Sequence, residues 1–208
     1  MDKSLSTKIQ SNDNTLLEAL CFCMPAHLFN RLIIVVPMGL CILMGAKNYD
    51  HMLTANGYKP VGNSITDDKK LAYGFCFFIL YGLSLLMMVC CTQIMKYTIK
   101  RERPVRRSDT TRISDLRGKE VGTYAMPSGD SSAAAVFCLL VAVEIGWPMI
   151  YVLMPLVMLG RVYYQCHWLG DTIVGLFVGS FWGLVGASNF AFLVPFFRAL
   201  VGSESFQD

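Results

Sequence analysis

The stretch LAYGFCFFILYGLSLLMMVCCTQIM (residues 71–95) contains no charged side chain. The hydrocarbon core of a bilayer is about 30 Å thick, and an α-helix needs roughly 20 apolar residues to cross it. The stretch is long enough to do so, and it contains no proline that would break the helix. We therefore predict a membrane-spanning helix here, and the same pattern recurs along the chain.

The composition of the whole chain also indicates a membrane protein. Hydrophobic residues make up 54% of the 208 residues and charged residues only 16%, which is too apolar for an ordinary soluble domain of this size. The sequence predicts an all-α, polytopic integral membrane helical bundle with five or six transmembrane helices. The expected spans are 28–46, 71–95, 131–145, 149–164 and 172–192, with a sixth short or interfacial piece ending at Phe197 and Arg198.

We expect a single domain with short flanking segments. Residues 1–27 are predicted to be polar and partly interfacial, residues 28–200 to form the transmembrane domain, and residues 201–208 to form a tail. No signal peptide is expected, because the first apolar run starts too late for one. Most of the cysteines lie inside apolar spans, where they pack as small hydrophobic residues, so no disulfide framework is predicted.

The net charge of +3 is concentrated between residues 96 and 127. This basic connection favours phosphate groups or acidic lipid headgroups as partners. Nucleic acid is not expected, because no soluble domain or aromatic platform accompanies the charge. By the positive-inside rule, the same excess predicts a cytosol-facing connection, in an internal membrane such as the endoplasmic reticulum.

Three polar motifs stand where predicted spans begin or end. They are K-x6-R-P at 96–104, P-S-G-D at 127–130 and G-R-x5-H-x3-D at 160–171. Counting helices places the end of the second span, the start of the third and the end of the fourth on the same membrane face. A shared site is therefore predicted at that face.

The first motif is basic. Lys96, Lys100 and Arg103 are spaced so that a helical extension of the second span would align them on one face, and Pro104 would stop that helix. Basic residues at the ends of spans otherwise serve as membrane anchors.

The second motif opens a helix. Ser128 can cap it, and Gly129 allows a ligand to approach the free amides at its start, which form a ready anion site. Capping alone would also explain these residues.

The third motif pairs a histidine with a carboxylate. His167 and Asp171 lie four residues apart, so Asp171 can accept the Nδ1 proton and leave Nε2 free to attack. In the other interpretation, Asp171 caps a helix that starts at Thr172 and His167 lies at the interface beside Trp168. The pair alone leaves both interpretations open.

Taken in order, these motifs resemble the three-part signature of the type 2 phosphatidic acid phosphatase (PAP2) and vanadium haloperoxidase superfamily, over about residues 71–188. The resemblance implies a helical bundle that hydrolyses lipid phosphates without a metal ion or another cofactor. It also implies a set of phosphate ligands. These are the side chains of Lys96, Arg103, Arg161 and Ser128, and the amide of Gly129.

The resemblance further implies that His167 attacks phosphorus to form a phosphohistidine, which water then cleaves. Asp171 would orient the imidazole and support its charge. Asp130 departs from the superfamily pattern, because a histidine that protonates the leaving alkoxide normally stands there. An aspartate in the first turn of a helix, close to several cations, is pushed toward its ionised form.

Three alternatives follow for Asp130. Its carboxyl group acts as the general acid after the occupied site raises its pKa. Alternatively, the substrate is a diphosphate, whose leaving phosphate needs little protonation. In the third alternative, catalysis is lost and the fold only binds lipid phosphate or protein partners.

The expected function is a membrane lipid phosphatase acting on a lipid phosphate monoester or a prenyl diphosphate, and the alternative is a catalytically inactive PAP2-like protein. A channel or transporter would need polar residues buried at mid-membrane, which are scarce here. Gly175, Gly179 and Gly183 recur every four residues, a spacing that suits packing within the chain or between protomers. The oligomeric state is therefore left open.

Overall fold

The computed structural model describes residues 2–12, 14–30, 35–58, 66–106, 112, 113, 116 and 124–200. All regular secondary structure in these ranges is helical, which confirms the predicted all-α class. The predicted tail at 201–208 lies outside the described residues, as does much of the basic connection. The elements are α1 (Asp2–Gln10), α2 (Thr15–Leu17), η1 (Glu18–Cys23), α3 (Met24–Leu28), α4 (Val35–Lys47), α5 (Tyr49–Ala55), α6 (Asp67–Ile99), α7 (Gly129–Glu144), η3 (Pro148–Val152), α8 (Leu153–Tyr163) and α9 (Leu169–Leu200).

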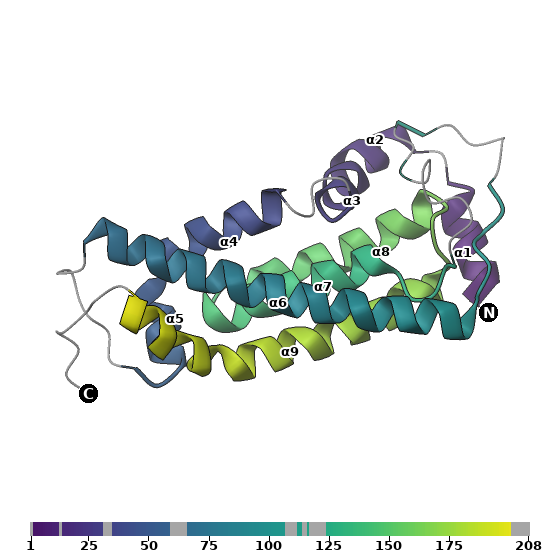
Figure 1. Ribbon diagram of the computed structural model, residues 1–208. Helices are drawn as coiled ribbons and strands as arrows, with labels where there is room; N and C mark the ends of the chain where they lie inside the picture. The colour runs from purple at the N-terminus through teal and green to yellow at the C-terminus, as the bar shows by residue number, and fades with distance from the viewer. Residues whose placement is uncertain are drawn as a thin grey trace.

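Helix α7 forms the centre of the bundle, and most of its residues are buried. Helices α6, α8 and α9 pack around it, and α4 packs along α6 (Figure 1). The end of α6, the start of α7, the end of α8 and the start of α9 meet at one end of the bundle, beside α1. The three polar motifs therefore come together there.

Small residues allow α9 to approach α7 closely. A Cβ atom added at Gly175 would lie 2.6 Å from the Ser128 carbonyl oxygen, and one added at Gly179 would lie 2.1 Å from the Ser132 carbonyl oxygen. Gly183 continues this surface against Leu139. The glycine stripe thus packs within the chain, and it fixes the start of α9 against the start of α7.

Helix α6 ends earlier than the sequence suggested. Lys100 adopts a left-handed conformation with φ 51°, and its N–H donates to the Lys96 carbonyl. The predicted helical extension to Pro104 is therefore wrong, and Arg103 reaches the site from a non-helical segment. The reason is that this segment makes other contacts, since the carbonyl of Arg101 accepts a hydrogen bond from the Ala125 amide.

Two of the described helices are long and apolar enough to cross a membrane, Asp67–Ile99 and Leu169–Phe196. The segments Val35–Lys47 and Pro148–Tyr163 are apolar but shorter. The count of five or six spans stays a prediction. No separate sixth piece forms, because α9 continues through Pro195 to Leu200.

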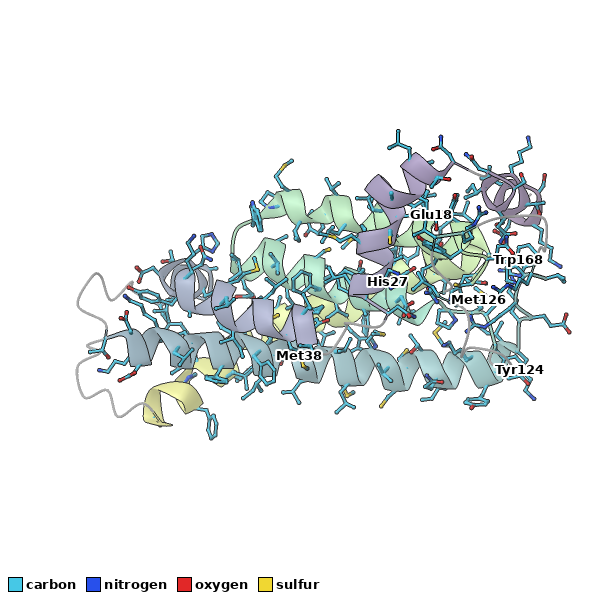
Figure 2. The ribbon with its side chains drawn as sticks, turned by 90° about the horizontal axis from the view of Figure 1, so that it is seen from above. Glu18, His27, Met38, Tyr124, Met126 and Trp168 are labelled. Atoms are coloured by element: carbon cyan, nitrogen blue, oxygen red, sulfur yellow. The ribbon has the colours of Figure 1, made fainter. Side chains whose placement is uncertain are left out.

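The N-terminal segment packs on the bundle beside the polar end. Phe22 and Ala26 form a small apolar cluster with Tyr163, Tyr164 and other residues at the end of α8. Figure 2 shows Tyr124, Met126 and Trp168 at this same end of the molecule. The segment therefore borders the candidate site.

Candidate active site

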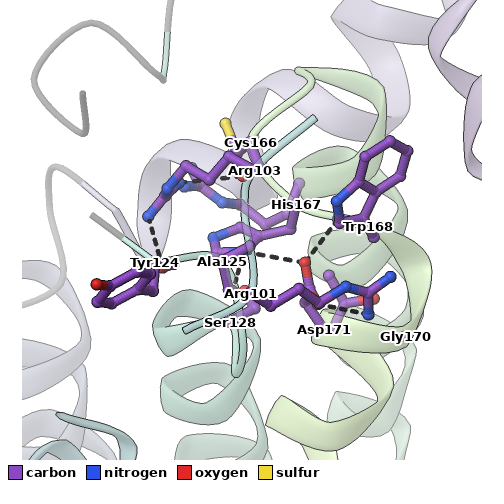
Figure 3. A network of polar contacts seen from close by, with 12 residues as sticks. Arg101, Arg103, Tyr124, Ala125, Ser128, Cys166, His167, Trp168, Gly170 and Asp171 are labelled. Atoms are coloured by element: carbon purple, nitrogen blue, oxygen red, sulfur yellow. Dashed lines mark hydrogen bonds and ion pairs between the residues drawn. The ribbon is translucent and has the colours of Figure 1, made fainter. Parts of the chain in front are cut away.

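His167 lies in the turn between α8 and α9 and is 2% exposed. Its Nδ1 atom is 2.7 Å from the Ala125 carbonyl oxygen (Figure 3). A carbonyl oxygen can only accept a hydrogen bond, so Nδ1 carries the proton and Nε2 keeps its lone pair in the neutral ring. This is the tautomer that a nucleophilic imidazole needs.

The expected hydrogen bond from His167 to Asp171 is replaced by the bond to Ala125. The Asp171 Oδ2 atom is 3.9 Å from Nδ1, which is an ion-pair distance and too long for a hydrogen bond. Asp171 is fully buried, and its Oδ2 accepts from the Trp168 amide at 2.8 Å. The carboxylate therefore lies beside the imidazole and can support a positive charge there.

The three predicted phosphate-binding cations surround His167. Arg161 is fully buried at the end of α8, and Lys96 is half-buried in the last turn of α6. The Arg103 guanidinium donates to the carbonyl of Cys166, next to the histidine, at 3.0 Å and to that of Tyr124, next to Ala125, at 3.5 Å. The site thus combines one imidazole with three cations.

Burial and these charges set the protonation state of the histidine. Burial lowers the pKa of His167 well below its ordinary value of 6.5, and Arg161, Arg103 and Lys96 lower it further. The hydrogen bond to Ala125 acts in the opposite direction but is the smaller effect. The imidazole is therefore neutral at neutral pH.

The start of α7 faces the same centre. Ser128 is buried and caps the helix, because its Oγ accepts from the Ser131 amide at 3.4 Å, and its own amide donates to the Asp171 carbonyl at 2.9 Å. A Cβ atom at Gly129 would meet no atom within 4 Å. Ser128 therefore acts as the predicted helix cap, and Gly129 leaves the helix start open to a ligand.

Asp130 takes part in an arrangement that the sequence did not suggest. Its Oδ2 atom is 2.9 Å from Arg161 Nε and accepts a hydrogen bond from Asn30 Nδ2 at 3.1 Å. The carboxylate therefore pairs with a cation that was expected to hold phosphate. Gly160, just before that arginine, allows α3 to approach, since a Cβ there would lie 3.3 Å from Ala26.

Sequence reasoning missed three residues that contact the site. Asn30 binds Asp130, and Arg101 donates to Asp171 Oδ1 at 2.9 Å. Asp2, at the start of α1, pairs with Arg101. Arg101 could have been singled out because it lies inside the K-x6-R-P motif, whereas nothing in the local pattern marks Asp2 or Asn30.

This geometry agrees with a comparison against protein-family models. The PAP2 superfamily model matches residues 77–194, which is more than half of the chain. The chain belongs to the PAP2 superfamily. Searches among curated proteins and among solved structures gave no match.

Membership in the PAP2 superfamily supports a phosphoester hydrolase at the level of the family. Together with the two long apolar helices, it also supports association with a membrane. The matched range covers most of α6, all of α7 and α8, and most of α9. It therefore includes every residue that was predicted for the site.

Proposed function

We propose that this chain is a multi-pass membrane phosphatase that removes a phosphoryl group from a lipid phosphate through His167. The observation that carries the proposal is the buried, neutral imidazole, whose Nδ1 is tied to the Ala125 carbonyl, surrounded by three cations. A transferring phosphoryl group needs its oxygen charges neutralised while a nucleophile attacks in line. Fixed cations and free helix amides can provide this neutralisation.

In the proposed reaction, Lys96, Arg103 and Arg161 hold the phosphate oxygens at the start of α7, next to Ser128 and the Gly129 amide. Nε2 of His167 attacks phosphorus, so a P–N bond forms and the bond to the leaving oxygen breaks. Water then attacks the phosphohistidine, which releases phosphate and restores the neutral ring.

Asp171 supports the charged phase of this reaction. When Nε2 carries the phosphoryl group, the ring is positively charged, because Nδ1 keeps its proton. The Asp171 carboxylate, 3.9 Å from Nδ1, then stabilises the ring electrostatically. We expect Asp171 to act through this charge, while the Ala125 carbonyl fixes the orientation of the ring.

The partners of Asp130 favour a diphosphate substrate. Arg161 and Asn30 both stabilise the ionised carboxylate, which has no proton to give to a leaving alkoxide. When a prenyl diphosphate is attacked at its terminal phosphorus, the leaving group is a prenyl monophosphate, which is far less basic. We therefore propose prenyl diphosphates ahead of lipid phosphate monoesters.

The second candidate function is a catalytically inactive protein that binds lipid phosphate or protein partners. The same ion pair favours it, because Asp130 occupies one of the cations that phosphate would need. Both candidates place an anion at the same site, and they differ in whether a phosphoryl group is transferred.

Phosphate release by the purified chain tests the proposal. The substrates are farnesyl diphosphate, farnesyl monophosphate, phosphatidate and a sphingoid phosphate, each with EDTA present to test the expected independence from metal. We expect turnover that is fastest on the diphosphate and is lost by roughly a thousandfold in His167→Ala. His51→Ala is the matched control, because His51 lies in α5 and contacts the Glu144 carbonyl at the far end of the bundle.

An inert wild type that binds inorganic phosphate would support the inactive candidate. Wild-type turnover that survives His167→Ala would overturn the assignment of the nucleophile. Equal rates on the farnesyl monophosphate and diphosphate would remove the argument for a diphosphate substrate.

A further inference from the structure

Both carboxylate oxygens of Asp171 accept hydrogen bonds within the chain. Oδ1 accepts from Arg101 Nη1 at 2.9 Å, and Oδ2 accepts from the Trp168 amide at 2.8 Å. The first of these is a charge-assisted bond to a buried carboxylate, which is stronger than a neutral one. Arg101 therefore helps to determine where the negative charge beside His167 lies.

Arg101 is in turn held by the N-terminal helix. Its Nη2 atom pairs with Asp2 Oδ2, and Asp2 Oδ1 accepts from the Gly170 amide at 2.8 Å. Burial acts to raise the pKa of Asp2, but the bonds from Arg101 and Gly170 outweigh it and lower that pKa. The charges therefore alternate from Asp2 through Arg101 to Asp171, and end at the imidazole of His167.

Helix α1 also supplies a second contact to the start of α9. Ser6 is fully buried, and its Oγ accepts from the Leu169 amide at 2.9 Å. Two of the first free amides of α9 are thus capped by side chains from a helix more than 160 positions away in the chain. These contacts fix α1 against the turn that carries Asp171.

The packing around Gly170 leaves little space for a side chain. A Cβ atom there would lie 3.0 Å from Asp2 Oδ2 and 3.2 Å from Arg101 Nη1. A methyl group would therefore push both charged groups away. This gives a way to disturb the pairing while all of its charges stay in place.

The backbone of Arg101 contributes to the other partner of the histidine. The Arg101 carbonyl accepts from the Ala125 amide at 2.7 Å, and the Ala125 carbonyl accepts from His167 Nδ1 at 2.7 Å. Arg101 therefore contacts both groups that border the Nδ1 edge of the ring. Its side chain can be changed while this backbone contact is kept.

We infer that Arg101 and Asp2 are positioning residues, which hold the Asp171 carboxylate where it stabilises a positively charged His167, and that helix α1 is thereby part of the active site. This inference rests on the proposed function, because it assigns a role within the phosphohistidine reaction. Neither residue contacts the reacting phosphorus. Each acts through Asp171.

A purely structural role for this network makes a different prediction. If Arg101 and Asp2 only anchored α1, their loss would weaken the fold or the binding of every anion to the same extent. If they position Asp171, their loss weakens above all the state in which the imidazole is charged. Orthovanadate resembles that state when Nε2 binds it in five-coordinate geometry, whereas inorganic phosphate resembles the bound ground state.

The test therefore measures the binding of both anions by calorimetry, on the purified full chain, for wild type, Arg101→Gln, Arg101→Lys, Asp2→Asn and Gly170→Ala. We expect Arg101→Gln to bind vanadate roughly ten- to a hundredfold more weakly, because the carboxylate is misplaced, and to bind phosphate within about twofold of wild type. Arg101→Lys keeps the positive charge and should recover part of the vanadate affinity.

Asp2→Asn retains an acceptor for the Gly170 amide but removes the charge that pairs with Arg101, so we expect a smaller and equally selective loss. Gly170→Ala should give the same selective loss by displacing both partners. Lys8→Gln is the matched control, because Lys8 is an exposed cation of the same helix, in its last turn. Its affinities should equal those of wild type.

Failure of the proposed function and failure of the positioning role give different results in this experiment. If wild type binds vanadate no better than His167→Ala does, the proposed function fails. If wild type shows the His167-dependent affinity, but the Arg101 and Asp2 variants keep it or lose both anions equally, the positioning role is overturned while the proposed function stands. Thermal unfolding of each variant checks that it is folded. If Arg101→Gln does not fold, the comparison is made with Asp2→Asn and Gly170→Ala.

Discussion

Asp130 and Arg161 form an ion pair between the start of α7 and the end of α8, with 2.9 Å between Oδ2 and Nε. The guanidinium is fully buried, while 17% of the carboxylate side chain is exposed. In the proposed reaction, phosphate must reach the same guanidinium. The carboxylate of the chain and the phosphate of the substrate therefore compete for one buried cation.

Removing the charge of Asp130 should strengthen phosphate binding. Asp130→Asn keeps the size of the side chain and an acceptor for Asn30, but it no longer competes for Arg161. We expect inorganic phosphate to bind about tenfold more tightly, which corresponds to about 1.4 kcal/mol. Calorimetry measures the affinity, with Asp67→Asn, an exposed aspartate far from the site, as the control. Unchanged or weaker binding in Asp130→Asn would contradict the competition.

Restoring a histidine at position 130 should change the choice of substrate. Asp130→His supplies a group that can donate a proton, and general acid catalysis contributes roughly a hundredfold or more where the leaving group is basic. Hydrolysis of farnesyl monophosphate should therefore rise relative to that of farnesyl diphosphate. The ratio of the two kcat/KM values is the measurement. A ratio equal to that of wild type would indicate that leaving-group protonation does not limit the reaction.

The pH dependence should reflect the low pKa of His167. Burial and the three nearby cations hold that pKa well below 6.5, so the reactive neutral imidazole persists as the pH falls through 6.5. The acidic limb of kcat/KM should therefore have its midpoint below pH 6.5. A limb assigned to His167 with a midpoint above 6.5 would be inconsistent with the site.

The lowered pKa of His167 should also make the free energy of unfolding depend on pH. Below pH 6.5 the unfolded chain protonates His167 before the folded chain does, so the unfolded state binds more protons and the free energy of unfolding falls as the pH falls. Burial raises the pKa of Asp171 to about 6, so protonation of this carboxyl acts in the opposite direction over the same range, in wild type and in His167→Gln alike. The measurement is therefore the difference in unfolding temperature between wild type and His167→Gln, which has no imidazole to titrate, and this difference should move against wild type between pH 7 and 5.

Alanine substitutions at two helix glycines should have opposite effects on stability, because only one of the two lies in the close contact between α9 and α7. At Gly179 a Cβ would lie 2.1 Å from the Ser132 carbonyl oxygen, so Gly179→Ala must force the helices apart, at a cost of about 3 kcal/mol or more. At Gly39 in α4 a Cβ meets nothing within 4 Å, so Gly39→Ala should stabilise by about 0.5–1 kcal/mol. Unfolding temperatures in detergent compare the two. Equal effects would argue against the close packing.

The helices and the meeting of the motifs could be predicted because they depend on local patterns. The run at 71–95 predicts α6, and Ser128 marks the start of α7, since apolar periodicity and capping are encoded in neighbouring residues. Counting the helices then brings Lys96, Ser128 and Arg161 to one end.

The partners inside the site could not be predicted in the same way. Spacing suggested that Asp171 would bind His167, but Arg101 and the Trp168 amide donate to its oxygens, and the Ala125 carbonyl accepts the hydrogen bond from Nδ1. These competitors come from segments distant in sequence or from the backbone, which periodicity does not report. The left-handed turn at Lys100 was missed for the same reason, because the spacing of basic side chains does not reveal where a backbone hydrogen bond ends a helix.

The hydrogen bond from Gly170 to Asp2 bears on which side of the membrane the candidate site faces. It ties α1 to the candidate site, so in the proposed multi-pass phosphatase the compartment that α1 faces is also the one that supplies water and receives the released phosphate. Helix α9 then runs to the opposite end of the bundle (Figure 1), so in the proposed multi-pass arrangement the end of α9 faces the other compartment. An epitope placed before α1 and one placed after α9 should therefore be digested from opposite sides of a sealed vesicle, and the first reports where phosphate is set free.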